Sequence, residues 1–182
     1  MVDGNVYFRQ FLDGDTASFE KLIKMYRESL IFFCMRYTHN SSLAEEIAED
    51  SFVELLLHKD RFNFSCSVKT YLFTIARNKA VNMLRKSKFS TELENFENSL
   101  EDTASLEEAV IKSDESRLLY KVLDKLSDDY RCALYLVYIE DLSYAQAGKV
   151  MKKSIKQIEN LVYRAKAAAR KELEKEGIVR EV

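Results

Sequence analysis

The chain of 182 residues contains no proline and only four glycines. Proline ends helices and glycine weakens them, so a chain with almost none of either has few interruptions between helical segments. It is rich in Leu, Glu, Lys and Ala, which are all good helix formers. The composition therefore predicts an all-α protein with short connections, long enough for one or two small domains.

Long apolar runs are also missing. None approaches the roughly 20 residues that a membrane-spanning helix needs, and the first residues carry no apolar segment typical of a signal peptide. Cys34, Cys66 and Cys132 are far apart and lack metal-ligand spacing with the two histidines. We therefore expect free thiols, no metal or other cofactor, no membrane insertion, and a place in the reducing cytoplasm.

Acidic residues are absent from residues 61–91, although the overall composition predicts about five in such a segment. Lys and Arg there alternate with Phe62, Phe64, Tyr71, Phe73 and Phe89. Cationic side chains attract phosphates, and aromatic faces stack on unpaired bases, so this basic stretch predicts a site for single-stranded nucleic acid. The alternative is an amphipathic helix with a solvated basic face, because apolar residues also recur there at helical spacing.

The acidic residues gather just beyond this stretch. Residues 91–116 hold nine acidic and one basic side chain, whereas the segments before and after are slightly basic. High charge and scattered apolar residues are typical of a flexible linker. We therefore predict an N-terminal domain over 1–90, an acidic linker over 91–116 and a C-terminal domain over 117–182.

Two amphipathic helices are predicted before the basic stretch. The first runs from Asp15, which can cap it, to Tyr37. Ser42 and Glu45 form a capping box for the second. The residues expected on its buried face are Ala44, Ile47, Ala48, Ser51, Phe52, Leu55 and Leu56.

The opposite face of this second helix carries Glu45, Glu46, Glu49 and Asp50. Acidic residues favour a helix N-terminus, so a solvated cluster is one interpretation. A docking surface for a basic partner is the other. Catalysis is discounted, because no nucleophile, His or Gly-rich loop accompanies these carboxylates.

The C-terminal segment predicts a helix-turn-helix. A helix that ends at Ser127 is followed by one over 128–140. Two capping boxes come next, Ser143 with Gln146 and Ser154 with Gln157. They begin a short helix to about residue 151 and a long one to about residue 176, which Gly177 ends. Two helices joined by a turn of about three residues fit the DNA-binding motif.

In that motif the second helix enters the major groove. Lys156, Gln157, Asn160 and Arg164 project from its outer side near its start. Gln and Asn can pair with adenine and Arg with guanine. The alternative is a helical hairpin with a Lys-rich surface. Phosphate contacts are expected from Lys152, Lys153, Lys166, Arg170 and Lys171.

In order and spacing, these segments resemble the bacterial sigma-70 family, in particular the two-domain extracytoplasmic-function type. The matching segments are Phe19-Glu20-Lys21-Leu22 with Tyr26, Ala44 to Phe52, Val68 to Asn78 with Leu84-Arg85-Lys86, Leu142 to Ala147, Ser154, Val162 to Ala165, and Leu173.

The resemblance implies a non-enzymatic transcription initiation factor. Its partners would be core RNA polymerase (the β′ clamp helices and the β subunit), double- and single-stranded promoter DNA, and an anti-sigma factor. Glu45, Glu46, Glu49 and Asp50 would bind the polymerase. The minus-ten and single-strand residues would be Phe62, Asn63, Phe64, Lys69, Arg77, Asn78, Asn82, Arg85 and Lys86. The minus-thirty-five residues would be Ser154, Lys156, Gln157, Asn160, Arg164 and Lys166.

The sequence departs from the family pattern in the helix-turn-helix. Gly148 stands where the family commonly has Ala, so we expect a first helix weaker by about 0.5–1 kcal/mol. Met151-Lys152-Lys153 replaces a Leu-Gly-hydrophobic turn. The turn and the promoter sequence that it serves could therefore be unusual.

Two other functions fit parts of the sequence. A stand-alone helix-turn-helix regulator would bind DNA without polymerase, at a two-fold symmetric site. A helical interaction protein would use its basic faces to bind acidic partners.

Overall fold

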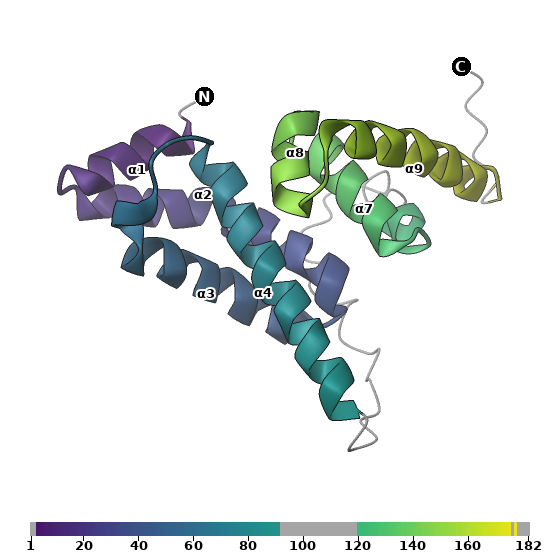
Figure 1. Cartoon of the computed structure of the whole chain (residues 1–182), viewed down its shortest axis with the longest axis horizontal. Helices are drawn as coiled ribbons and strands as arrows, with labels where there is room; N and C mark the ends of the chain where they lie inside the picture. The colour runs from purple at the N-terminus through teal and green to yellow at the C-terminus, as the bar shows by residue number, and fades with distance from the viewer. Residues whose placement is uncertain (1–2, 92–119, 176, 178–182) are drawn as a thin grey trace. The chain divides into compact units, whose positions relative to one another are not determined.

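The computed structural model describes residues 3–91, 120–175 and 177, with only the backbone given for 87–91. The chain divides into two compact units, Met1–Leu100 and Glu101–Val182. The predicted acidic linker lies outside the described residues except for Thr91. All regular structure in the described residues is helical, as the composition predicted (Figure 1).

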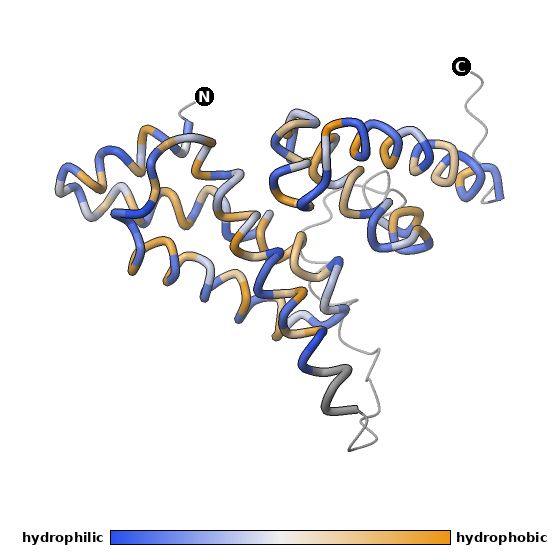
Figure 2. The backbone as a smooth tube through the Cα atoms, viewed as in Figure 1, coloured by the Kyte–Doolittle hydropathy of each residue, from blue (hydrophilic) through white to orange (hydrophobic). Residues whose placement is uncertain are grey.

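Unit 1 contains α1 (Gly4–Leu12), α2 (Thr16–Thr38), α3 (Ser41–Leu57), the 3-10 turn η1 (Lys59–Arg61) and α4 (Val68–Thr91). The long α2 packs against α1, α3 and α4. Its residues 30–36 are consecutively buried, as expected for a helix that is covered on several sides. Hydrophobic and hydrophilic residues alternate along these helices (Figure 2). Side chains less than 2 % exposed include Leu22, Leu30, Phe33, Leu55, Leu72 and Phe73.

Helix α1 was not predicted from the sequence. Asp3 caps it by accepting a hydrogen bond from Asn5 N. Asn5 in turn accepts a hydrogen bond from Val68 N at 2.8 Å, at the start of α4. Gly4 lies against the ring of Tyr26, so close that a Cβ would collide with it. Contacts with both α2 and α4 therefore fix the position of α1.

The start of α3 differs from the prediction. Asn40 caps the helix through its side chain, which accepts from Leu43 N at 2.9 Å. Ser42 lies inside the first turn, so it cannot serve as the cap. Leu56 also departs from the expected buried face and is 40 % exposed. The predicted cap at Asp15 of α2 is confirmed by a 3.1 Å bond from Ala17 N.

Unit 2 contains a helical segment over residues 120–124, α7 (Asp128–Leu134), the π-helical turn η2 (Tyr135–Ile139), α8 (Tyr144–Met151) and α9 (Ile155–Lys175). The predicted helix over 128–140 is present up to residue 139, but its last five residues are π-helical, which was not predicted. Wider hydrogen bonds, such as Glu140 N to Tyr135 O at 2.9 Å, change the helix register there. Tyr138 is consequently exposed and Leu142 buried.

A buried arginine that the sequence analysis did not single out ties the start of unit 2 together. Arg131 is 5 % exposed, and its guanidinium donates to the carbonyl oxygens of Asp124 and Leu126, both at 3.0 Å. These carbonyls lie at the end of the helical segment 120–124 and in the bend after it. Ser127 occupies the N-cap position of α7 as predicted, but its side chain makes no capping bond. Arg131 thus provides hydrogen bonds to backbone carbonyl groups near the end of a helical segment.

The turn between α8 and α9 corrects the expectation for Gly148. Lys152 ends α8 in the left-handed conformation, with φ 56°, and Lys153 N donates to Gly148 O at 3.0 Å. A Cβ on Gly148 would lie 2.7 Å from the backbone oxygen of Lys153. Glycine therefore permits a tight turn here, and its effect is not limited to weakening the helix.

We expect Gly148→Ala to destabilise unit 2 by about 1–2 kcal/mol, because the overpacking against backbone exceeds the gain in helix propensity. Urea unfolding of the full chain, with hydrogen exchange to assign the change to unit 2, measures this.

Lys152→Gly is the matched variant in the same turn. It removes the left-handed strain and should stabilise the unit by about 1 kcal/mol. A more stable Gly148→Ala protein would contradict the role assigned to Gly148.

Candidate nucleic-acid interface

The predicted acidic cluster lies on the outside of α3, where Ala44, Ile47, Ala48 and Ser51 are buried on the other side. Glu46, Glu49 and Asp50 are exposed and Glu45 is half-buried. We call Glu45, Glu46, Glu49 and Asp50 the acidic surface. They come together on one stretch of helix because their spacing repeats every three or four residues.

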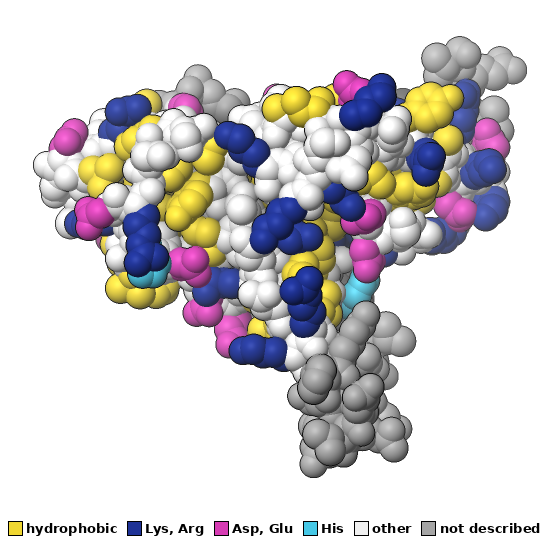
Figure 3. Space-filling model, viewed as in Figure 1, with side chains coloured by type: hydrophobic (Ala, Val, Ile, Leu, Met, Phe, Trp, Pro, Cys, Tyr) yellow, Lys and Arg dark blue, Asp and Glu magenta, His cyan; other side chains and the backbone are white. Residues whose placement is uncertain are grey.

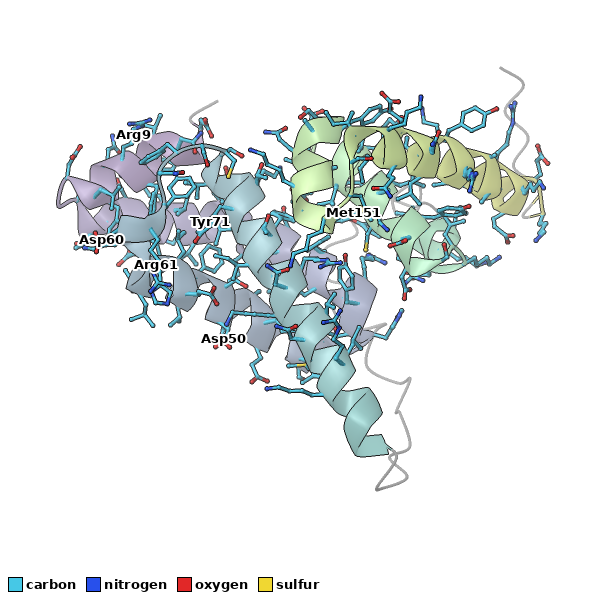
Figure 4. The ribbon with its side chains drawn as sticks, viewed as in Figure 1. Arg9, Asp50, Asp60, Arg61, Tyr71 and Met151 are labelled. Carbon is cyan, nitrogen blue, oxygen red and sulfur yellow. The ribbon has the colours of Figure 1, made fainter. Side chains whose placement is uncertain are left out.

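Two members of the acidic surface are already paired within unit 1. Arg27 of α2 lies 3.3 Å from Glu49, and Lys79 of α4 lies 3.6 Å from Asp50. Figure 4 labels Asp50 on α3. Surface pairs of this kind stabilise by at most about 1 kcal/mol, so a partner can replace them. In the part of the chain that the structure describes, no ion pair involves Glu45 or Glu46.

An exposed apolar patch continues the acidic surface toward the end of α3. It consists of Val53, Leu56 and Leu57, which are 50 %, 40 % and 70 % exposed. Val53 and Leu57 follow Glu46, Glu49 and Asp50 at the same helical spacing, so one stripe changes from charged to apolar. Large exposed apolar side chains beside polar ones are typical of a protein-binding surface. This patch was not predicted from the sequence, where Leu56 was expected on the buried face.

The loop between η1 and α4 holds three predicted single-strand residues in different settings. Phe62 is only 6 % exposed, and its ring centroid lies 5.5 Å from Phe8 and 5.0 Å from Tyr71. Asn63 is exposed, and its side-chain oxygen accepts from Ser65 N at 3.1 Å. Phe64 is half-buried, with φ at 57°. Phe62 therefore acts as a core anchor, and the neighbouring residues line the surface.

Helix α4 brings some of the remaining predicted residues together and separates others. Asn78, Asn82 and Arg85 fall on one outer stripe, at spacings of four and three residues. Tyr71 and Thr74 begin the same stripe, about two turns and one turn before Asn78. In Figure 3, Lys and Arg side chains are spread over the visible face of α4. We call Tyr71, Thr74, Asn78, Asn82 and Arg85 the α4 stripe.

Two predicted cations of α4 lie off this stripe. Lys69 points its amine toward the rings of Tyr26 and Phe73, 6.0 Å from each centroid. Arg77 is half-buried on another side of the helix, whereas the exposed Lys86 follows Asn82 by four residues and lies at the edge of the stripe. Fewer of the single-strand residues predicted on α4 can therefore contact the same strand of nucleic acid.

Both predicted capping boxes of the helix-turn-helix are present. Ser143 and Gln146 exchange backbone-to-side-chain bonds. Ser154 N donates to Gln157 Oε1 at 2.8 Å, and Gln157 N donates to Ser154 Oγ at 3.2 Å. The side chain of Gln157 is thereby oriented before any ligand binds, while its NH2 group keeps its donors.

A surface hollow of about 270 Å³ lies along the start of α9, lined by Lys153, Gln157, Asn160, Leu161 and Arg164. Three predicted base-reading residues, Gln157, Asn160 and Arg164, thus converge on one face. Lys153 also forms an ion pair with Asp129 of α7 at 3.1 Å. This pair fixes the turn between α8 and α9 against α7.

Two other predicted residues of α9 are engaged elsewhere. Lys156 is highly exposed and lies 3.1 Å from Glu159. Lys166 lies over the ring of Tyr138, 4.6 Å from its centroid. A hydrogen bond with Tyr138 raises the pKa of Lys166. Lys166 is on the flank of α9, where phosphate contact fits better than base contact.

Two exposed apolar side chains of α9 were not predicted as contact residues. Ile155, the first residue of the helix, is 52 % exposed, and Tyr163 is 79 % exposed. An apolar residue at the start of a reading helix can contact a thymine methyl group. The sequence feature that could have indicated these contacts is an Ile and a Tyr on the otherwise polar outer face of α9.

No group of His, Cys, Asp and Glu among the described residues could hold a metal ion. The three cysteines are free, as predicted. No described helix has the length and apolar character needed to cross a membrane.

Comparison with known proteins gives two family matches, one in each unit. The chain matches Sigma-70 region 2 over residues 22–89 and Sigma-70, region 4 over residues 116–168. Its relatives include the ECF RNA polymerase sigma factor SigW of Bacillus subtilis, 27% identical over 175 residues, which cover 91% of this chain and 94% of SigW. RNA polymerase sigma-H factor of Pseudomonas aeruginosa is 27% identical over 171 residues, which cover 88% of this chain and 89% of that protein.

Solved structures show the same fold. The sigma factor RpoE, in complex with the anti-sigma factor NepR from Bartonella quintana, matches with a TM-score of 0.66 and 21% identity over 86% of this chain and 96% of RpoE. CnrH, in complex with the cytosolic domain of CnrY, matches with a TM-score of 0.67 and 19% identity over 95% of this chain and 99% of CnrH.

The helices, their order and both family matches define a transcription initiation factor with two working units. The chain belongs to the sigma-70 family, as a sigma factor of the extracytoplasmic-function type. The family predicted from the sequence is thus confirmed, and it is a family of non-enzymatic factors.

Proposed function

We propose that this chain binds core RNA polymerase through α3, opens promoter DNA along α4, and reads an upstream promoter element with α9. The observation that carries the proposal is the succession of the two sigma-70 regions, each with an exposed face suited to its partner. Since these partners work in the bacterial cytoplasm, the proposal places the chain there.

The polymerase contact is assigned to the acidic surface and the apolar patch beside it. Carboxylates attract a basic partner and fix its orientation, while Val53, Leu56 and Leu57 offer apolar area to bury. Under the proposal, the β′ clamp helices occupy this stripe, and the β subunit contacts other parts of the chain. Binding would exchange the pairs Arg27–Glu49 and Lys79–Asp50 for intermolecular ones.

Promoter opening is assigned to the loop before α4 and the α4 stripe. Asn78, Asn82 and Arg85 can donate to base edges and phosphates of the non-template strand. Asn63 and Phe64 stand at the beginning of the same helix, so one strand can pass from the loop to the stripe. Holding the separated strand in this way would favour the melted state of the duplex.

Upstream recognition is assigned to the face of α9 that borders the hollow. Gln157, Asn160 and Arg164 would meet base edges in the major groove, and Ser154, Lys156 and Lys166 would contact the surrounding phosphates. Each unit alone has a small DNA surface. Polymerase would fix the separation of the two units, so the second contact gains from a high effective concentration.

We further propose that an anti-sigma factor controls the chain. RpoE, which shares its fold, is seen in complex with the anti-sigma factor NepR, and CnrH, with the same fold, in complex with the cytosolic domain of CnrY. The exposed apolar patch on α3 is a surface that such a protein could cover.

Glu46→Lys tests the polymerase contact more cleanly than a change at Glu49 or Asp50, because those two have ion-pair partners within unit 1. We expect the affinity for core RNA polymerase to fall at least about tenfold, since a like charge would face the basic partner. Titration of fluorescently labelled chain with core polymerase measures it.

Glu28→Lys is the matched control, with the same charge change at an exposed position of α2. It should bind polymerase as the unchanged chain does. Equal losses in both variants would indicate a general charge effect and contradict the assignment to α3.

Arg164→Ala tests upstream recognition. Loss of a bidentate pair to guanine should weaken holoenzyme binding by about 1–3 kcal/mol and relax the preference at one base position. The readout is the set of sequences that the holoenzyme enriches from a pool of random DNA.

Arg170→Ala is the comparison, because Arg170 lies on another stripe of α9 and is 3.8 Å from Glu174. It should weaken binding slightly and equally for all sequences. An unchanged sequence preference in Arg164→Ala would overturn the role of Arg164.

A further inference from the structure

We propose that Arg9, on helix α1, forms part of the single-stranded DNA site as a platform on which an unpaired base stacks. This inference rests on the proposed function and extends the site to an element outside the basic stretch. It follows from the way that α1 covers the loop before α4.

The aromatic rings of this loop are largely occupied by other protein groups. Phe62 is buried, and Phe64 lies 4.7 Å from it and 6.2 Å from Phe8, measured between ring centroids. The guanidinium of Arg9 lies over the Phe64 ring, with Cζ 4.0 Å from the centroid. A base therefore cannot stack on the ring face that Arg9 covers without displacing the arginine.

The outer side of Arg9 is available instead. Arg9 is exposed, and among the residues that the structure describes it forms no ion pair. A guanidinium plane can itself stack on a base, and its N–H groups point sideways, toward base edges or phosphates. The Phe64 ring beneath it restrains the side chain, which reduces the entropy lost when a base binds.

The backbone conformation of Phe64 indicates that surrounding contacts hold this residue in a defined position. Phe64 has φ at 57°, a conformation that costs an L-residue free energy and that occurs mainly where surrounding contacts enforce it. Asn63 accepts from Ser65 N on one side of it, and Phe62 anchors the loop in the core. These contacts hold Phe64 under Arg9.

Helix α1 is positioned firmly enough to serve the site. Phe8, next to Arg9, is fully buried and contacts both loop rings. Asn5 binds the first amide of α4, Val68 N, at 2.8 Å. In Figure 4, Arg9 lies at α1, and Tyr71, the first residue of the α4 stripe, lies on the helix that the loop enters. Arg9, Asn63 and the α4 stripe thus form one path for a strand.

The experiment uses the full chain assembled with core RNA polymerase. The probe is duplex DNA with an unpaired segment whose sequence the unchanged holoenzyme has enriched from a random pool. Arg9→Ala should weaken binding about 5- to 100-fold, as loss of one stacked base does. Arg9→Lys keeps the charge but not the plane, so it should retain most of this loss while keeping the salt dependence of binding.

Arg61→Ala is the matched control, because Arg61 is an exposed arginine at the end of η1, directly before the same loop (Figure 4). It should change affinity far less than Arg9→Ala. Thermal unfolding checks that each variant remains folded, and Arg9→Lys, with its retained positive charge, provides a second test if Arg9→Ala is unstable.

Three results would overturn the inference. The first is an unchanged affinity for the probe in Arg9→Ala. The second is full affinity in Arg9→Lys, which would mean that Arg9 contributes only its charge. The third is a loss of affinity in Arg61→Ala equal to that in Arg9→Ala. Failure of the unchanged chain to bind polymerase or the unpaired probe would instead contradict the proposed function, and this inference with it.

Discussion

The packing of three helices around α2 is the interaction on which unit 1 depends. Burying a large apolar side chain such as Leu22 or Leu30 stabilises the fold by about 1.5–3 kcal/mol each. Because α1, α3 and α4 all bury one face against this helix, their outer faces are fixed in relation to one another. The acidic surface, the α4 stripe and Arg9 are therefore presented by one rigid core.

A single side chain links two of these faces. Lys79 of α4 lies 3.6 Å from Asp50 and 3.1 Å from Glu54 of α3. It belongs to the acid-free basic stretch, yet its charge is directed at the helix assigned to polymerase. The positive charge of the basic stretch therefore helps to hold α3 and α4 together, and does not only attract DNA.

Much of this architecture could be predicted from the sequence. Helical periodicity gave the long helices, and the capping boxes at Ser143 and Ser154 located the helix-turn-helix, because both signals depend on neighbouring residues. Helix α1, the η2 turn and the clash behind Gly148 could not be predicted, since each depends on residues distant in the chain or on backbone geometry.

The candidate site also has parts that the sequence could predict and parts that only the fold reveals. Composition located the basic stretch, and spacing grouped Gln157, Asn160 and Arg164 on one face. Composition and spacing could not distinguish Phe62, which is buried, from Phe64, which is half-buried, because both are phenylalanines of the same short loop. Arg9 lies outside the basic stretch altogether, and only the fold brings it to Phe64.

We propose that the chain directs promoter-specific initiation only together with polymerase. Transcription by core RNA polymerase, with and without the chain, from a pool of random DNA templates, followed by sequencing of the RNA 5′ ends, tests this dependence. We expect chain-dependent starts downstream of two sequence elements at a fixed separation. No chain-dependent starts, together with binding of the chain alone to a two-fold symmetric site, would contradict it and favour a stand-alone regulator.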